Sequence, residues 1–209
     1  MIVPALLTDK KDELIRMVNF CATFTDYVQI DIMDGEFVPS QSVKLRDLKD
    51  WKLPLRSEAH LMVSDPCIWL PAFKTLGVER IIYHFEAVDE HQETIAKIKA
   101  LGLGVGLAIN PSTEIDEFQS LVNEVDTILF LSVNPGFYGA AFIPRVLEKI
   151  RNFKNRYPQM QAGVDGGIKR DNLVEVKRSG VDYICVGSAI LKSIDPAKSY
   201  VEFMKLFNG

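Results

Sequence analysis

The chain has 209 residues, a length that predicts one domain spanning residues 1–209. Hydrophobic residues make up 47% and charged residues 25% of it, values typical of soluble globular proteins, so intrinsic disorder is excluded. With 24 Lys and Arg against 28 Asp and Glu, the net charge is −4, which offers no overall attraction for nucleic acid or for an anionic membrane. An anionic ligand would therefore need local donors.

Short runs rich in β-branched residues alternate with segments of helical periodicity. The runs that predict strands are Ile2 to Leu6, Tyr27 to Asp31, Ser57 to Val63, Arg80 to His84, Gly104 to Ile109, Thr127 to Val133, Gln161 to Val164 and Tyr183 to Val186. The segments that predict helices are Asp9 to Thr23, Cys67 to Leu76, Asp89 to Leu101, Ile115 to Val122, Pro144 to Tyr157, Arg170 to Ser179 and Pro196 to Phe207. This alternation favours an α/β fold of right-handed βαβ units, a single (β/α)8 TIM barrel.

The cysteines and the N-terminal residues indicate in which cellular compartment the protein is expected. The chain has three widely spaced cysteines, at positions 21, 67 and 185, so neither a disulfide framework nor a cysteine zinc site is expected. The first residues show no signal-peptide pattern, and no stretch approaches the ~20 apolar residues of a membrane span. We therefore expect a cytoplasmic protein without a membrane partner.

Polar side chains share one face on each of two consecutive predicted strands. Because side chains alternate along a strand, Gln29 and Asp31 lie on one face of the second strand, and Glu58 and His60 on one face of the third. A carboxylate inside a barrel needs a partner, so Asp31 is expected to be paired, metal-bound or protonated. The alternative is that Asp31 only caps the loop that follows.

The fourth predicted strand ends in a further polar pair. His84 and Glu86 lie on the same face of this strand, again at its carboxyl end. We interpret them as a hydrogen-bonded pair that orders the following loop. A direct catalytic role is the alternative.

Glycines follow each of the last three predicted strands, where barrels commonly bind phosphate. Their backbone N–H groups and the starts of the following helices can surround an anion, which would let an acidic protein hold a phosphorylated ligand. Tight turns, which any barrel needs, are the alternative explanation. The candidate ligand-binding residues in these loops are Gly136, Tyr138, Gly139, Gly166, Gly167, Gly187 and Ser188.

A second carboxylate stands at the end of the seventh predicted strand. This residue is Asp165, and the barrel places it across from the second strand. Asp31 and Asp165 would then approach one small substrate from opposite faces. Two opposed carboxyl groups suit a proton transfer in which one accepts the proton and the other donates it.

Seven motifs follow one another along the chain in the order QIDIMDGEFVP (29–39), HLMVSDP (60–66), HFEA (84–87), GLAINP (106–111), VNPGF (133–137), VDGGI (164–168) and VGSA (186–189). In this order they resemble the ribulose-phosphate 3-epimerase family, from Pro4 to about Leu191. The resemblance implies a (β/α)8 barrel that inverts the carbon next to a ketose carbonyl through an enediolate. It also implies that Asp31 and Asp165 serve as acid and base.

The resemblance further implies a divalent metal ion held by two histidines and the two aspartates. Asp31, Asp165 and His60 match three of these ligands, whereas Gln29 stands where the family has the other histidine. An amide oxygen is a weaker and harder donor than imidazole, which disfavours zinc and iron. The candidate ions are zinc, iron, manganese, cobalt and magnesium, and with Gln29 as a doubtful ligand the preference moves toward manganese, magnesium or no ion. Without one, Gln29 and His60 would have to stabilise the enediolate.

The residues expected around the substrate match the family in part. Met33 and Met62 match two of the family's three methionines over the active site, and Leu131 replaces the third. Ala5 replaces a serine that contacts the substrate in the family. Tyr138 stands where the family has a very small residue, so it would narrow the pocket or present its hydroxyl to the ligand.

Three functions remain open. The leading prediction is a 3-epimerase that converts ribulose 5-phosphate to xylulose 5-phosphate, or one acting on another ketose phosphate such as allulose 6-phosphate. Aldol chemistry of the hexulose-phosphate synthase type is the second, although its aspartate and lysine signature is not found on the strands. The third is a sugar-phosphate-binding protein that has lost catalysis, motivated by Gln29, Ala5 and Tyr138. Because family members are often dimers or hexamers, we expect a homo-oligomer that binds a small phosphorylated ketose.

Overall fold

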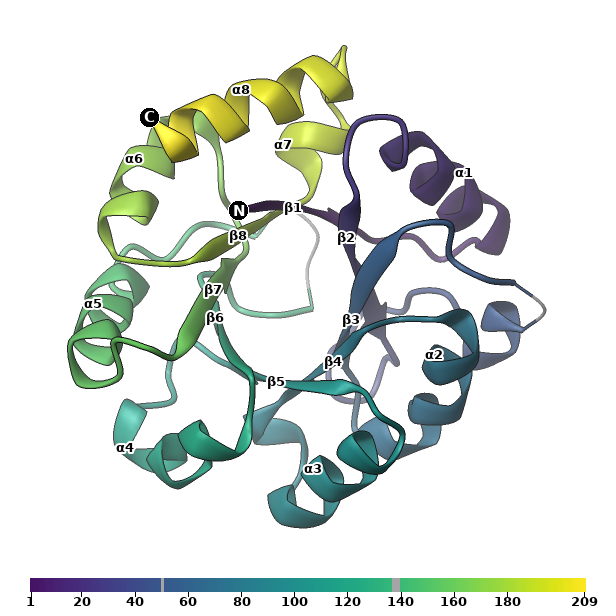
Figure 1. The fold of residues 1–209 in the computed structure, drawn as a ribbon, viewed down its shortest axis with the longest axis horizontal. Coiled ribbons are helices and arrows are strands. Elements are labelled where there is room, and N and C mark those ends of the chain that lie inside the picture. The colour runs from purple at the N-terminus through teal and green to yellow at the C-terminus, as the bar shows by residue number, and fades with distance from the viewer. Residues whose placement is uncertain (50, 137–139) are drawn as a thin grey trace.

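A closed barrel of parallel strands forms the centre of the molecule. The computed structural model describes residues 1–49, 51–136 and 140–209. Within these residues eight strands follow one another round the barrel in sequence order, and β8 pairs with β1 to close it. Helices surround the barrel on its outside (Figure 1). The predicted α/β fold, a (β/α)8 TIM barrel, is confirmed.

The strands and helices have the following bounds in the structure. The strands are β1 Ile2–Leu6, β2 Tyr27–Met33, β3 Arg56–Met62, β4 Arg80–His84, β5 Gly104–Ile109, β6 Thr127–Leu131, β7 Gln161–Asp165 and β8 Tyr183–Val186. The helices are α1 Lys11–Cys21, α2 Leu70–Leu76, α3 His91–Ala100, α4 Ile115–Phe118, α5 Val146–Arg156, α6 Arg170–Arg178, α7 Ser188–Leu191 and α8 Pro196–Asn208. The 3-10 segments are Leu45–Leu48, Pro66–Trp69, Phe85–Ala87 and Gln119–Glu124.

The structure differs from the sequence-based expectation mainly in its shortest elements. The helix expected from Ile115 to Val122 is divided into α4 and a 3-10 segment. Phe118 and Leu121 are both buried, and their spacing of three suits a 3-10 turn as well as an α-helix. Helix α7 was not expected, because four residues carry too little periodicity to be recognised.

Strand side chains alternate between the barrel interior and the layer beneath the helices. Ile30 and Leu61 point outward and belong to the large core between strands and helices. Val3 and Leu129 point inward and belong to a smaller core inside the barrel. The same alternation turns the polar residues of β2 and β3 toward the interior, as the sequence predicts.

A buried ion pair fills the barrel one layer below the carboxyl ends of the strands. Arg80 donates from Nε and Nη2 to Glu58 Oε2, at 2.9 and 2.5 Å. Arg80 also donates from Nη1 to Gln161 Oε1 at 2.7 Å, and the Tyr27 hydroxyl donates to Glu58 Oε2 at 3.2 Å. Burial raises the pKa of the Glu58 carboxyl, and the charge of Arg80 opposes this shift. Glu58, two residues before His60 on β3, is thus paired with Arg80 inside the barrel.

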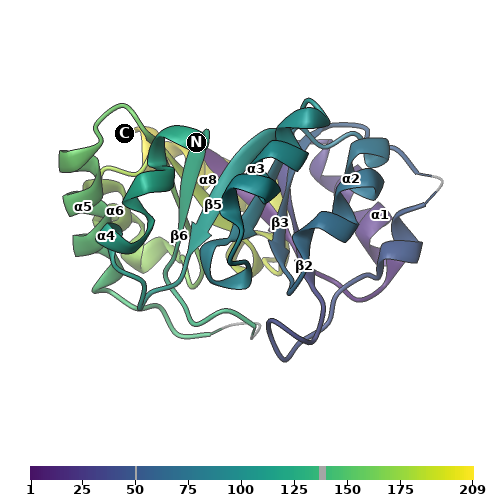
Figure 2. The same cartoon turned by 90° about the horizontal axis from the view of Figure 1, so that it is seen from below.

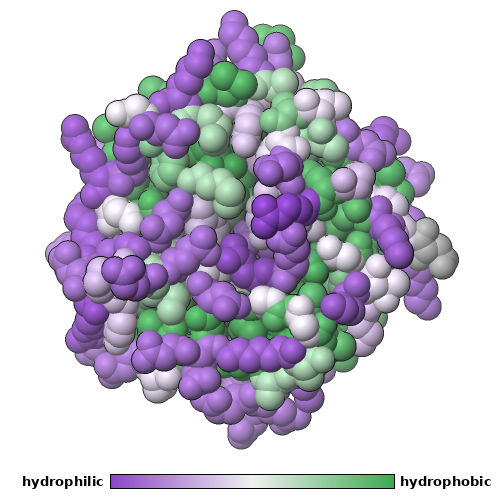
Figure 3. Space-filling model, in the orientation of Figure 1, coloured by the Kyte–Doolittle hydropathy of each residue, from purple (hydrophilic) through white to green (hydrophobic). Residues whose placement is uncertain are grey.

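Two views show how the rest of the chain is placed. Both termini lie on one side of the barrel, and the loops after β2 and β6 lie on the other (Figure 2). The face seen in Figure 3, in the orientation of Figure 1, is mostly hydrophilic, with hydrophobic residues visible between. Among the described residues, the structure contains no helix with the length and hydrophobicity that a membrane span requires.

The buried ion pair makes a prediction about stability. Replacing Arg80 by Met leaves the Glu58 charge buried without its partner, and we expect a loss of about 3–5 kcal/mol in the free energy of unfolding. The double variant Arg80→Met/Glu58→Met removes both charges, so it should recover most of that loss. Denaturant unfolding of the three proteins measures both effects. A double variant no more stable than the single one would contradict this description of the pair.

Candidate active site

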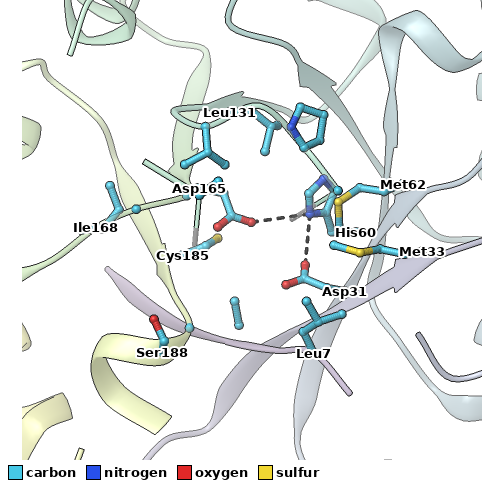
Figure 4. A pocket seen from close by; sticks show the side chains of 18 of the residues that line it. Leu7, Asp31, Met33, His60, Met62, Leu131, Asp165, Ile168, Cys185 and Ser188 are labelled. Carbon is cyan, nitrogen blue, oxygen red and sulfur yellow. Dashed lines mark hydrogen bonds and ion pairs between the residues drawn. The ribbon is translucent and has the colours of Figure 1, made fainter. Parts of the chain in front are cut away.

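A cavity of about 240 Å³ opens at the carboxyl ends of the strands (Figure 4). This volume lies below the usual range of ligand pockets and suits a small metabolite. Two of the predicted ligand-binding residues, Tyr138 and Gly139, lie outside the described residues. The predicted site residues that line the cavity are Asp31, Met33, His60, Met62, Gly136, Asp165, Gly166, Gly167, Gly187 and Ser188.

Asp31, His60 and Asp165 converge at the bottom of this cavity, as Figure 4 shows. Asp31 lies directly opposite His60 in the pairing of β2 with β3, so their inward side chains are neighbours. His60 Nδ1 is 3.0 Å from Asp31 Oδ1 and 3.5 Å from Asp165 Oδ2. Strands far apart in the sequence therefore bring two carboxyl groups and an imidazole to one point.

Gln29 lies fully buried beneath these three residues. Its Nε2 donates to Asp31 Oδ1 at 2.9 Å and to Asp165 Oδ2 at 2.7 Å, and it lies 3.5 Å from His60 Nδ1. On the other side of the amide, the Cys185 thiol donates to Gln29 Oε1 at 3.1 Å. Burial raises the pKa of the Cys185 thiol, so the thiol keeps its proton and can donate.

Three of these side chains could hold a metal ion. One ligand atom from each of Asp31, His60 and Asp165 lies within 4.8 Å of the others. The fourth ligand of the set that the resemblance implies would have to come from Gln29. Its nitrogen, which faces the carboxylates, is a hydrogen-bond donor and cannot bind a cation. As arranged, the four side chains do not fit a four-ligand metal site.

A second histidine supports His60 from behind. His60 Nε2 lies 3.0 Å from His84 Nε2, and His84 Nδ1 lies 3.5 Å from Glu86 Oε2. Glu86 in turn accepts hydrogen bonds from the Asn110 backbone N–H at 2.8 Å and from the Thr113 hydroxyl at 2.6 Å. Glu86 therefore holds the loop after β5, as the loop-ordering interpretation expects, whereas His84 Nδ1 lies near it without forming the expected hydrogen bond.

The electrostatics of the cluster favour a charged His60 beside a neutral His84. Burial alone would lower the pKa of His60, but hydrogen bonds and charges from Asp165 and Asp31 outweigh it and raise the pKa to about 9. Burial lowers the pKa of His84 to about 4, so His84 can accept a hydrogen bond from His60. Burial also raises the pKa of Asp31, against the opposing effect of its hydrogen bond with His60.

The loop after β7 needs glycine for two reasons. Gly166 and Gly167 have φ angles of 109° and 64°, which other residues rarely adopt. A Cβ on Gly166 would lie 2.5 Å from Val133 Cγ2, and one on Gly167 would lie 3.0 Å from the Phe142 backbone. Glycine therefore lets this loop pack against Val133 and Phe142, and both glycines line the cavity.

Several cavity residues were not predicted from the sequence. Lys169 follows the glycine pair after β7, and a cation next to a proposed phosphate loop was a signal that could have identified it. Cys185 was predicted only to be a small buried residue, since a thiol within an apolar strand carries no functional signal. The cavity is also lined by Leu7, Val133, Pro135, Ala140 and Ile168.

Solved structures share this fold across nearly the whole chain. The 3-hexulose-6-phosphate synthase of Salmonella typhimurium superposes with a TM-score of 0.71 at 16% identity, covering 99% of this chain and 98% of that one. The orotidine 5'-phosphate decarboxylase of Pyrococcus horikoshii OT3 gives 0.67 at 16% identity and covers 100% of both chains. At such identities the match shows the fold alone, so the chain belongs to the class of (β/α)8 barrels.

Sequence comparison identifies the family. A family model described as "Ribulose-phosphate 3 epimerase family" matches residues 1–191. The chain is 34% identical over 184 residues to the ribulose-phosphate 3-epimerase of Escherichia coli (strain K12), covering 85% of this chain and 82% of that protein. It is 32% identical over 183 residues to the enzyme of the same name from Mycobacterium leprae (strain TN), covering 82% and 80%. The chain therefore belongs to the ribulose-phosphate 3-epimerase family and is an enzyme of the isomerase class.

The raised pKa of His60 predicts a pH-dependent stability. Its pKa is about 9 in the folded protein against 6.5 for an unperturbed histidine, so the stability it contributes is complete below 6.5 and is lost as the pH rises through about 9. We expect the Tm to fall by several degrees over this range. In His60→Gln the fall in Tm should be smaller than in wild type. In His91→Gln, which removes a histidine outside the site, the fall should be as large as in wild type. Equal falls in all three proteins, measured with chelator present, would contradict the charged state of His60.

Proposed function

We propose that this enzyme interconverts ribulose 5-phosphate and xylulose 5-phosphate by moving a proton at carbon 3, with residues 1–209 acting as one cytoplasmic domain. The observation that carries the proposal is the convergence of Asp31 and Asp165 in one cavity, within 4.8 Å of each other and of His60. Two carboxyl groups at one small site suit an epimerisation, because inversion needs a base on one side of the carbon and an acid on the other.

The proton transfer would use the two aspartates in turn. In one direction the Asp165 carboxylate removes the proton from carbon 3, the electron pair moves into an enediolate, and the Asp31 carboxyl group returns a proton from the opposite face. The reverse reaction exchanges the two roles. Burial supports this assignment for Asp31, since it raises the pKa of that carboxyl to about 6, where it can both release and take up a proton near neutral pH.

His60 would stabilise the enediolate. Its imidazole lines the cavity beside both carboxyl groups, and its pKa of about 9 keeps it charged at neutral pH. A fixed positive charge next to a developing oxyanion, in a site with little water, lowers the energy of the transition state. His84, which lies 3.0 Å from the far side of the ring, would hold the imidazole in place.

Apolar side chains would exclude water from the reacting end. Met33 and Met62 both line the cavity and are at most 6% exposed. They form a small apolar cluster with Val38, and Leu131 lines the cavity as well. A wall of this kind strengthens the electrostatic interactions of the charged groups it surrounds.

The other end of the cavity would bind the phosphate. Gly166, Gly167, Gly187 and Ser188 line it after β7 and β8, where (β/α)8 barrels commonly hold phosphate. Lys169 lines the same part of the cavity and would supply a positive charge. This arrangement explains how a protein of net charge −4 could bind an anion.

The two aspartates provide the direct test of this function. Asp31→Asn and Asp165→Asn keep the size of the side chain and remove its acid–base chemistry, so each should lower kcat by about 10²- to 10⁴-fold. A coupled assay with ribulose 5-phosphate, and separately with allulose 6-phosphate, measures the loss and the substrate preference. Wild-type protein that binds a ketose phosphate in calorimetry but turns over neither substrate would instead support the binding protein without catalysis.

Lys169 provides a test of the phosphate end. We expect Lys169→Gln to raise KM for the phosphorylated substrate by about tenfold, because one charge-assisted contact is worth roughly 1.5 kcal/mol or more. Turnover at saturation should change little, since Lys169 would contact the phosphate and not the reacting carbon. Lys205→Gln, which removes an exposed charge on α8, is the matched control. An unchanged KM in Lys169→Gln would remove this lysine from the phosphate site.

A further inference from the structure

The amide nitrogen of Gln29 is the common neighbour of all three candidate ligand atoms. It lies 2.9 Å from Asp31 Oδ1, 2.7 Å from Asp165 Oδ2 and 3.5 Å from His60 Nδ1. The two shorter contacts use both of its hydrogens, one for each carboxylate. The primary amide thus joins, by hydrogen bonds, the two groups that a divalent cation would otherwise join.

The orientation of this amide is fixed by its partners. An amide turned by 180° would place its oxygen against one carboxylate oxygen of Asp31 and one of Asp165, and would turn its NH2 group toward the Cys185 thiol. In the observed orientation the three hydrogen bonds of the amide each pair a donor with an acceptor, because its NH2 group donates to both carboxylates and the thiol donates to Gln29 Oε1 at 3.1 Å. Both side chains are at most 1% exposed, so water cannot take over either role.

We propose that the amide of Gln29, held in place by Cys185, replaces the divalent metal ion between Asp31 and Asp165, so that this enzyme neither retains nor requires such an ion. The claim that activity does not require an ion rests on the proposed function. The structural part of the proposal, that Gln29 excludes a tightly bound ion, stands on the hydrogen-bond geometry alone.

An amide and a divalent cation would hold the two carboxylates together by different interactions. A divalent ion draws the two carboxylates together by charge, and the resemblance to the family gives it a further ligand, a histidine, where this chain has Gln29. A primary amide offers two donors in fixed directions and adds no charge. The carboxyl pair is therefore positioned by hydrogen bonds within the protein, and its geometry does not depend on the supply of metal.

The test compares the metal content of four proteins. Wild type, Gln29→His, Cys185→Ala and Cys185→Ser are purified without chelator, and bound metals are measured by elemental analysis. ZnCl2 and MnCl2 are then titrated into each metal-free protein by calorimetry. Gln159→His, which adds a histidine at an exposed turn before β7, controls for nonspecific binding. Epimerase activity of the wild type is assayed with and without chelator.

We expect wild type to hold far less than one equivalent of metal and to keep its activity in chelator. Loss of a supporting residue near a metal already lowers affinity by about 10- to 100-fold, so Gln29→His should bind Zn²⁺ at least about 100-fold more tightly than wild type. Cys185→Ala frees the amide to turn its oxygen inward and should bind metal more tightly than wild type. Cys185→Ser keeps a donor at that position and should resemble wild type.

Stoichiometric metal in the wild-type protein would overturn the proposal, whatever the variants do. So would an equal affinity for Zn²⁺ in wild type and Gln29→His, or a loss of wild-type activity that follows removal of metal. If Gln29→His does not fold, the metal content of wild type and the comparison of Cys185→Ala with Cys185→Ser still decide the matter. If the wild type holds no metal as purified and shows no epimerase activity, the proposed function is contradicted, whereas the exclusion of metal by Gln29 is still supported.

Discussion

The burial of two carboxyl groups side by side inside the barrel is the constraint on which the rest of the site depends. Two negative charges in a water-poor interior repel each other and lose their hydration, so their neighbours must supply positive charge and hydrogen-bond donors. In this protein those neighbours are His60 and Gln29, both turned inward by strands β3 and β2. The residues behind them, His84 and Cys185, contact these donors on their far sides.

The barrel provides this arrangement without requiring any special backbone at the cluster itself. Parallel pairing of β2 with β3 aligns Asp31 with His60, and the period of two along each strand keeps Gln29 on the same face as Asp31. Below them the pair formed by Arg80 and Glu58 fills the barrel and balances its own charge. Asp31, His60 and Asp165 therefore lie above a buried ion pair whose charges cancel.

Much of this could be predicted from the sequence. The alternation of β-rich runs and helical segments indicates the barrel, and strand periodicity identifies Asp31, His60 and Asp165 as inward residues at carboxyl ends. The orientation of Gln29 could not be predicted, because an amide can donate or accept on either side. It depends on Asp165 and Cys185, which contact the two ends of the amide and lie 136 and 156 residues away in the sequence. The pairing of Glu58 with Arg80 was missed for the same reason, since it depends on which inward side chains meet.

The central claim is that two different carboxyl groups handle the proton on opposite faces of one carbon. The most direct measurement is the fate of hydrogen at carbon 3 when ribulose 5-phosphate reacts in D2O for a small fraction of a turnover, read by NMR. The account predicts deuterium at carbon 3 of the epimerised product, with the remaining substrate still carrying its original hydrogen. A product that keeps the original hydrogen would mean that one group removes and returns the proton, and would contradict the account.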